Sequence, residues 1–132
     1  MRPESRARER AFLCAYAVDM KGSISPDIIK ELQKDDSEEV KSFSDMLFTG
    51  MSSRIPQIDN IIGRHLKNWT VERLSSVDRS LLRVAVYEML YYKKTPPKVI
   101  FDEYVELAKR YGDTDSGSFV NAVLDAIYKD KD

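Results

Sequence analysis

Few side chains in this sequence could carry out catalysis. The single histidine, His65, flanks an apolar stripe, and one His with one Cys, Cys14, cannot form a His/Cys metal cluster. No G-x-x-x-x-G-K-[ST] or G-x-G-x-x-G loop occurs, and there is no G-x-S-x-G turn. Glu88 shares a helical face with Leu81 and Val84, where a carboxylate needs a cation or donors, and a structural pairing with another helix is the favoured interpretation. We therefore expect no catalytic residue, no metal and no cofactor.

Arginines near the start of the chain could bind an anion. They are Arg2, Arg6, Arg8 and Arg10, in the segment MRPESRARER. At about 100° per residue, Arg2, Arg6 and Arg10 lie opposite the apolar face of a first helix and should point to solvent, with Arg8 elsewhere. Cations at a helix N-terminus oppose its dipole. Two interpretations stay open: a solvated basic helix end, or a site for phosphate, which suits the guanidinium fork.

Two aromatic residues could stack on a nucleobase, and both could instead pack inside the protein. Tyr16 follows the arginines on the same helix, and Phe119 lies about 90° from the centre of the apolar face of the last helix. Asp115 and Ser116 precede Phe119 and are candidates for the helix N-cap. A stacked base contributes about 1–3 kcal/mol, whereas emptying a core Phe site costs about 3–5 kcal/mol, so different assays separate the two roles.

The elements that position these residues are all predicted to be helices. Strand alternation is nearly absent, whereas apolar residues recur three and four positions apart. The predicted helix starts are near the N-terminus, at Ser25, Ser37 and Pro56, at Ser75 or Ser76, near Lys98, and after Ser116. We expect an all-α fold of about seven helices, forming one domain of two small packed helical bundles over about 1–68 and 69–132.

Local patterns within those helices lead to further expectations. The first helix has a narrow face of small residues made of Ala7, Ala11, Cys14, Ala15 and Val18. A later stripe runs through Ile55, Ile58, Ile62, Leu66 and Trp69. The segment SSVDRSLLRVAVYEMLYY is the most apolar and should form a central, buried helix. Gly112 is expected to end the next helix in a left-handed conformation.

Composition is that of an ordinary globular protein. The chain has 132 residues, 42% of them hydrophobic and 33% charged, with a net charge of −1. Residues 1–10 hold four arginines against two glutamates, a balance of +2 that leaves −3 for the rest. A lone cysteine cannot form an internal disulfide, and we find no transmembrane span or signal peptide, so a cytoplasmic location is expected.

Long ordered motifs identify a family. The segments WTVERLSSVDRSLLRVAVYEMLY and PPKVIFDEYVELAKRYGDTDSGSFVNAVLDAI resemble the C-terminal half of NusB family proteins, and SRARERAFLCAYAVD resembles their first helix. The resemblance covers residues 5–20 and about 69–128, while residues 21–68 agree only in helical pattern and length.

The resemblance implies a non-catalytic role in bacterial transcription antitermination. NusB proteins pair with NusE, a small-subunit ribosomal protein, and the pair binds single-stranded boxA RNA in nascent transcripts. This helps RNA polymerase to read through terminators, notably in ribosomal RNA operons. The resemblance therefore predicts an RNA surface made of Arg2, Arg6, Arg8, Arg10, Tyr16, Asp115, Ser116 and Phe119. It predicts a NusE surface around Val77, Asp78 and Leu82.

The sequence also departs from the family pattern. Many relatives carry Lys or Arg where this chain has Ser118, and often Gly where it has Ala122, while Glu9 dilutes the basic run. We expect weaker RNA binding that depends on NusE. The alternatives are a stand-alone RNA-binding domain like that of some ribosomal RNA methyltransferases and a helical protein-interaction module. A DNA-binding helix-turn-helix lacks a basic recognition face. The free protein is expected to be a monomer or a homodimer.

Overall fold

Helices account for all regular secondary structure in the part of the chain that the structure, a computed structural model, describes, which is residues 1–130. The seven α-helices of this part are α1 (Pro3–Lys21), α2 (Pro26–Leu32), α3 (Glu38–Ser52), α4 (Ile55–Arg64), α5 (Ser76–Tyr87), α6 (Pro97–Tyr111) and α7 (Ser116–Lys129). A 3-10 turn, η1 (Val71–Arg73), precedes α5, and a π-helical turn, η2 (Glu88–Tyr92), extends it. The predicted all-α class is confirmed.

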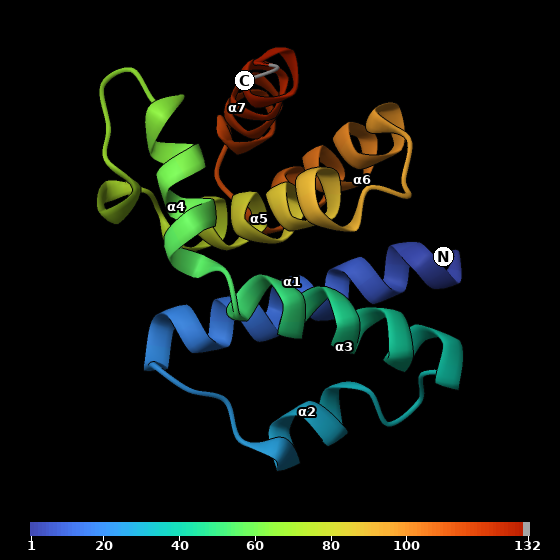
Figure 1. Ribbon diagram of the computed structural model, residues 1–132. Helices are drawn as coiled ribbons and strands as arrows, with labels where there is room; N and C mark the ends of the chain where they lie inside the picture. Colours follow the sequence, from blue (N-terminus) through green and yellow to red (C-terminus); the bar gives the residue numbers. More distant parts are fainter. Residues whose placement is uncertain (131–132) are drawn as a thin grey trace.

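Helix α1 runs through the middle of the molecule (Figure 1). It packs against α3 on one side and against α5 on the other, with α2 lying beyond α1 and α3. Helix α5 also contacts α4, α6 and α7, and α6 packs along α7. The boundary predicted near residue 68 stays a prediction, and the predicted end at 132 lies outside the described residues. None of the helices within 1–130 has both the length and the apolarity needed to span a membrane.

Serine hydroxyls begin three of these helices, as the sequence predicted. The Oγ atoms of Ser25, Ser37 and Ser75 accept hydrogen bonds from the backbone N–H three residues on, at 3.3, 3.2 and 3.1 Å. Each bond satisfies one of the N–H groups that a helix start leaves without a partner.

The core forms where the small face of α1 meets its neighbours. Ala7, Ala11, Cys14 and Ala15 are buried there, so α3 and α5 can approach closely. Burial raises the pKa of the Cys14 thiol to about 11, which makes it an unreactive core residue. The predicted central helix is confirmed, because α5 buries Leu81, Leu82, Val84, Ala85 and Val86.

The predicted apolar stripe after Pro56 stops early. Helix α4 ends at Arg64, where the backbone changes to bonds between residues three apart, from His65 N–H to the Ile62 carbonyl and from Leu66 N–H to the Gly63 carbonyl. Gly63 lowers helix propensity at this end. Trp69 therefore lies in the connection that follows and is 56% exposed, so the prediction that it belongs to the apolar stripe is wrong.

The prediction of a left-handed Gly112 is also wrong. Its φ is −93°, in the extended region, whereas left-handed conformations occur at Gly22 (φ 86°) and Lys93 (φ 64°). Gly112 serves a different purpose, because a Cβ atom there would lie 2.3 Å from Ser116 Oγ and 2.8 Å from the Ala108 carbonyl oxygen. The absence of a side chain lets the start of α7 fold closely against the end of α6.

Candidate nucleic-acid interface

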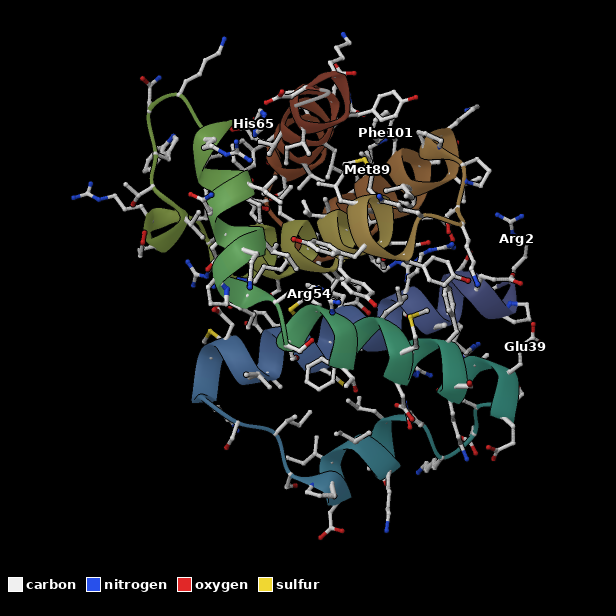
Figure 2. The ribbon with its side chains drawn as sticks, in the orientation of Figure 1. Arg2, Glu39, Arg54, His65, Met89 and Phe101 are labelled. Carbon is white, nitrogen blue, oxygen red and sulfur yellow. The ribbon has the colours of Figure 1, made fainter. Side chains whose placement is uncertain are left out.

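Two of the predicted arginines are available at the surface. Arg2 is exposed at the start of α1 and projects from the outer end of that helix (Figure 2). The Arg6 side chain is 42% exposed, and its Nη1 lies 3.7 Å from Asp36 Oδ1. The prediction that these two side chains point to solvent is confirmed. Together they form a cationic end on α1 that can contact an anion.

Arg10 is held by a carboxylate and is largely covered. Its Nε donates to Asp36 Oδ2 at 2.8 Å and its Nη2 to Asp36 Oδ1 at 3.3 Å, and the side chain is 16% exposed. The hydrogen bond to Asp36 raises the pKa of Arg10 and outweighs the effect of burial. The bidentate pair ties α1 to the connection between α2 and α3, so Arg10 points less to solvent than predicted.

Arg8 lies inside the protein, and its predicted place on the RNA surface is wrong. The residue is 4% exposed. Its Nε donates to both carboxylate oxygens of Glu88, at 2.9 and 3.0 Å, and its Nη2 donates to Oε2 at 2.7 Å. Nη1 donates to Glu103 Oε1 at 2.9 Å. A guanidinium enclosed by two carboxylates has no free face for a phosphate group.

Glu88 confirms the predicted pairing between helices. Besides Arg8, it accepts hydrogen bonds from Thr95 Oγ1 at 2.7 Å and from the Tyr104 hydroxyl at 2.6 Å. Burial first, and then the Glu88 charge, raise the pKa of Tyr104 well above its ordinary value. All of these groups have partners, so the buried charge joins α1, η2 and α6 without an unsatisfied oxygen.

A second polar cluster brings the end of α6 to the middle of α1. Glu9 Oε2 accepts from Arg110 Nη1 at 2.5 Å and from the Tyr111 hydroxyl at 2.6 Å. The Tyr111 ring centre lies 5.1 Å from that of Phe12, which lies 6.2 Å from that of Tyr16. Tyr16 is half-buried against the core. These contacts hold the end of α6, which leads into α7, against α1.

Phe119 lies at the boundary between core and surface, as predicted. It is half-buried and packs against the core. Its remaining surface lines a hollow of about 310 Å³, here called the acidic hollow. The residues around it are Trp69, Arg73, Leu74, Ser75, Asp78, Asp113, Asp115 and Phe119. A ring at such a rim can both pack inside and offer one face to a ligand.

The two residues before Phe119 differ from expectation. Asp115 occupies the N-cap position of α7 and is exposed, but its side chain makes no capping bond. Ser116 is 1% exposed. Its Oγ accepts from Asp113 N–H at 3.1 Å and lies 3.2 Å from Asp113 Oδ1. Because the hydroxyl is buried in this turn, the prediction that Ser116 contacts RNA is wrong.

The residues predicted to contact NusE differ in how far they are buried. Leu82 is fully buried, so its predicted place on a contact surface is wrong. Val77 and Asp78 remain half-buried at the start of α5. Asp78 Oδ1 is buried without a hydrogen-bond partner, and burial together with the nearby Asp113 charge raises the pKa of Asp78. A hydrogen bond with the Ser116 side chain opposes this rise, so the Asp78 carboxyl is tied to the start of α7.

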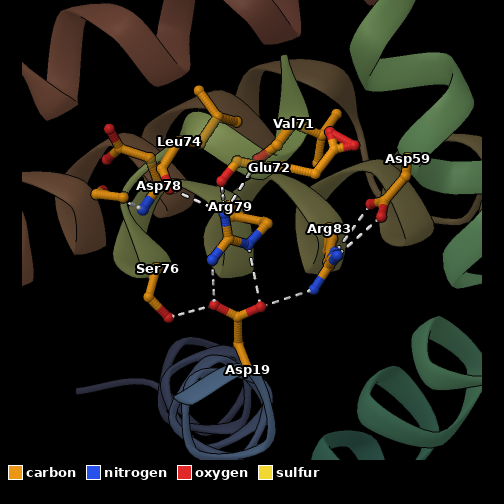
Figure 3. Close-up of polar contacts among 10 residues, drawn as sticks. Asp19, Asp59, Val71, Glu72, Leu74, Ser76, Asp78, Arg79 and Arg83 are labelled. Carbon is orange, nitrogen blue, oxygen red and sulfur yellow. Dashed lines mark hydrogen bonds and ion pairs between the residues drawn. The ribbon is translucent and has the colours of Figure 1, made fainter. Parts of the chain in front are cut away.

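The start of α5 is positioned by a network that sequence analysis missed (Figure 3). Asp19 of α1 accepts from Ser76 Oγ at 2.5 Å, from Arg79 at 3.0 and 2.7 Å, and from Arg83 Nη1 at 3.1 Å. Arg83 also donates twice to Asp59 of α4, each time at 2.8 Å. Arg79 and Arg83, four residues apart on α5, could have indicated such a network, but the carboxylate that both contact, Asp19, lies about 60 residues earlier in the chain.

The NusB family model matches residues 5–129. This chain belongs to the NusB family. It is 43% identical over 121 residues to a transcription antitermination protein NusB from Bacillus cereus (strain B4264). The aligned region covers 92% of this chain and 93% of that relative. The family resemblance is confirmed, and the match includes the segment 21–68 that resembled the family only in pattern.

Solved NusB structures have the same fold. T. maritima NusB aligns with a TM-score of 0.90 and 35% identity, covering 98% of this chain and 93% of that chain. A crystal structure of antitermination factors NusB and NusE in complex with dsRNA aligns with a TM-score of 0.88 and 35% identity, covering 98% of each chain. The predicted NusB-like fold is confirmed.

Proposed function

We propose that this chain is a non-catalytic transcription antitermination factor that acts with NusE. The pair binds the single-stranded boxA element of nascent RNA and promotes read-through by RNA polymerase, notably in ribosomal RNA operons. The observation that carries this proposal is membership of the NusB family over residues 5–129. The similarity to a NusB that was crystallised with NusE and dsRNA supports both partners.

The proposed RNA surface combines exposed arginine side chains with half-exposed rings. Arg2 and Arg6 supply phosphate contacts, because their side chains are the least covered of the four arginines. Arg10 contributes only through the part of its guanidinium that Asp36 leaves open. Phe119 stacks on a base, and Tyr16 presents the exposed edge of its ring. The Asp115 carboxylate can accept a hydrogen bond from a base amino group but repels phosphate.

The proposed NusE surface is the exposed start of α5. Val77 supplies apolar contact, and Asp78 supplies the half-buried carboxyl group beside it. Leu82 supports this surface from beneath, because it is fully buried in the core. The network around Asp19 holds this end of α5 against α1.

Fluorescence anisotropy with a labelled boxA RNA tests the function. We expect preference for boxA over a scrambled RNA, tighter binding when NusE is present, and weaker binding by Phe119→Ala. Loss of one stacked base should lower affinity by about five- to 150-fold. Equal binding of boxA and scrambled RNA, with and without NusE, would contradict the proposal. Binding of NusE without any RNA binding would favour the protein-interaction alternative.

A matched variant separates RNA contact from folding. Phe101 is also half-buried, and its ring packs edge-on against Tyr128 with centres 5.9 Å apart, outside the proposed surface. Phe101→Ala should lose stability comparable to that lost by Phe119→Ala but retain boxA affinity. Equal loss of RNA affinity in both variants would mean that Phe119 acts through the fold.

A further inference from the structure

A second hollow adjoins Phe119 and shares two lining residues with the acidic hollow. It measures about 410 Å³ and lies between the segment after α4 and the outer face of α7. We call it the Trp69 hollow; its lining includes Leu66, Lys67, Asn68, Trp69, Phe119 and Ala122. Trp69 and Phe119 line both hollows, so the two rings stand where the hollows meet. Trp69 is 56% exposed although indole is a largely apolar group.

The residues that line the Trp69 hollow suit an apolar, aromatic ligand. Phe119, Ala122, Val123 and Ala126 recur at helical spacing along one wall, on α7. Ala122 and Ala126 are exposed and small, so this wall offers an open apolar floor. Trp69 stands on the opposite wall, in a segment outside any helix. An aromatic ring can therefore lie against the indole without displacing a side chain from α7.

The charges around the two hollows differ. The acidic hollow has Asp78, Asp113 and Asp115 against Arg73, whereas no carboxylate within residues 1–130 lines the Trp69 hollow. Lys67 and Asn68 are exposed at its rim. His65 on the same side is held by the Ile61 carbonyl and by Asp130, each at 2.8 Å. A polyanionic backbone is therefore tolerated beside Lys67 and disfavoured beside the three aspartates.

We propose that the Trp69 hollow binds a nucleobase of single-stranded RNA. The base stacks on the indole of Trp69, next to the base that stacks on Phe119. Asn68 hydrogen-bonds the base edge, and Lys67 contacts the adjoining phosphate. This inference rests on the proposed RNA function and extends the bound strand beyond the residues that the family motifs suggested. It is based on the pair of rings, the wall of small residues on α7 and the lack of carboxylates among the described residues that line the hollow.

Intrinsic fluorescence provides a direct test, because Trp69 is the only tryptophan in the chain. Adding boxA RNA to the full chain at low salt should quench Trp69 emission, with the same midpoint as the anisotropy titration. An abasic ribose-phosphate strand of equal length retains the backbone charge and should leave the emission unchanged. Equal quenching by both strands would overturn the inference, because it would show that the backbone, not a base, reaches Trp69.

Variants supply the second readout. Trp69→Ala should weaken boxA binding by about five- to 150-fold, and Trp69→Phe should retain most of the affinity. Tyr128→Ala removes another exposed ring from α7, outside the hollow, and should bind as wild type does. Circular dichroism checks that each variant is folded.

Three outcomes would count against the inference. If wild type binds boxA but its emission stays constant and Trp69→Ala binds equally well, the inference fails and the proposed function stands. If Trp69→Ala weakens binding of NusE and not of RNA, the hollow is a protein contact and the inference is overturned. If wild type binds no RNA even with NusE present, both the inference and the proposed function fail.

Discussion

The guanidinium of Arg8 lies 2.7 Å from the carboxylate of Glu88, although 80 positions separate the two residues in the chain. The side chains of both are almost fully enclosed, at 4% and 0% exposure. Burial lowers the pKa of Arg8, but the hydrogen bonds to Glu88 and the Glu88 charge outweigh this effect and raise it. The pair joins the beginning of α1 to η2, directly after α5, so one of the four predicted RNA arginines serves the fold.

Removing Arg8 should therefore affect stability rather than RNA contact. Arg8→Met is expected to lower the free energy of unfolding by about 3–5 kcal/mol, because it leaves Glu88 buried without its cation. Urea denaturation measures the loss. Arg6→Gln, on the exposed side of the same helix, should change stability by no more than about 0.5 kcal/mol. An Arg8→Met protein of wild-type stability that has lost RNA affinity would contradict this assignment.

Salt should weaken the RNA complex in proportion to its phosphate contacts. With two to four contacts on a single strand, the slope of log affinity against log salt should be about −1.4 to −2.8. Replacing both Arg2 and Arg6 by Gln should make the slope shallower by about 1.4, since two contacts are lost. Ser118 is exposed one position before Phe119. Ser118→Lys should steepen the slope by about 0.7. A salt-independent affinity would rule out the arginine contacts.

Asp19 should make the protein's stability depend on pH. Burial alone would raise the pKa of this carboxyl, but hydrogen bonds from Arg79 and Ser76 and the charges of Arg79 and Arg83 lower it. A lowered pKa means that the carboxylate stabilises the fold above its unfolded pKa of about 3.9. This contribution is lost as the pH falls through the lower pKa of the folded state.

Asp19→Asn tests this dependence. At pH 7 it should lower the free energy of unfolding by about 1–3 kcal/mol, because arginine donors lose a charged acceptor. The difference from wild type should shrink as the pH falls below about 4. Denaturation curves at several pH values measure it, and a difference that stays constant down to low pH would assign the loss to packing.

Two glycines should respond oppositely to the same substitution. Gly112→Ala should destabilise the protein by about 1–3 kcal/mol, because its Cβ would overlap Ser116 and the Ala108 carbonyl. Gly63→Ala places a methyl group 3.7 Å from Val71 Cγ2, an ordinary contact, inside α4. It should stabilise the protein by about 0.5–1 kcal/mol. Thermal unfolding measures both, and a Gly112→Ala protein as stable as wild type would show that the α6–α7 turn can open.

Features that depend on short stretches of chain could be predicted from the sequence. Helix starts at Ser25, Ser37 and Ser75 were predictable, because a capping hydroxyl bonds to an N–H only three residues away. The all-α class followed from apolar spacing, which is also local. The buried α5 was recognisable because apolar residues surround most of it. Motif order was sufficient to identify the family.

Which candidate residues reach the surface depends on how distant helices pack together, so the sequence could not predict it. Arg8 and Arg6 are alike in type and neighbouring in sequence, but Arg8 meets Glu88 and Glu103 while Arg6 stays half-exposed. Leu82 is buried, whereas Trp69 is exposed because α4 ends before the predicted stripe does. The physical reason is that burial and charge pairing depend on which distant elements pack together. Periodicity orients a side chain on its own helix but does not specify what it meets there.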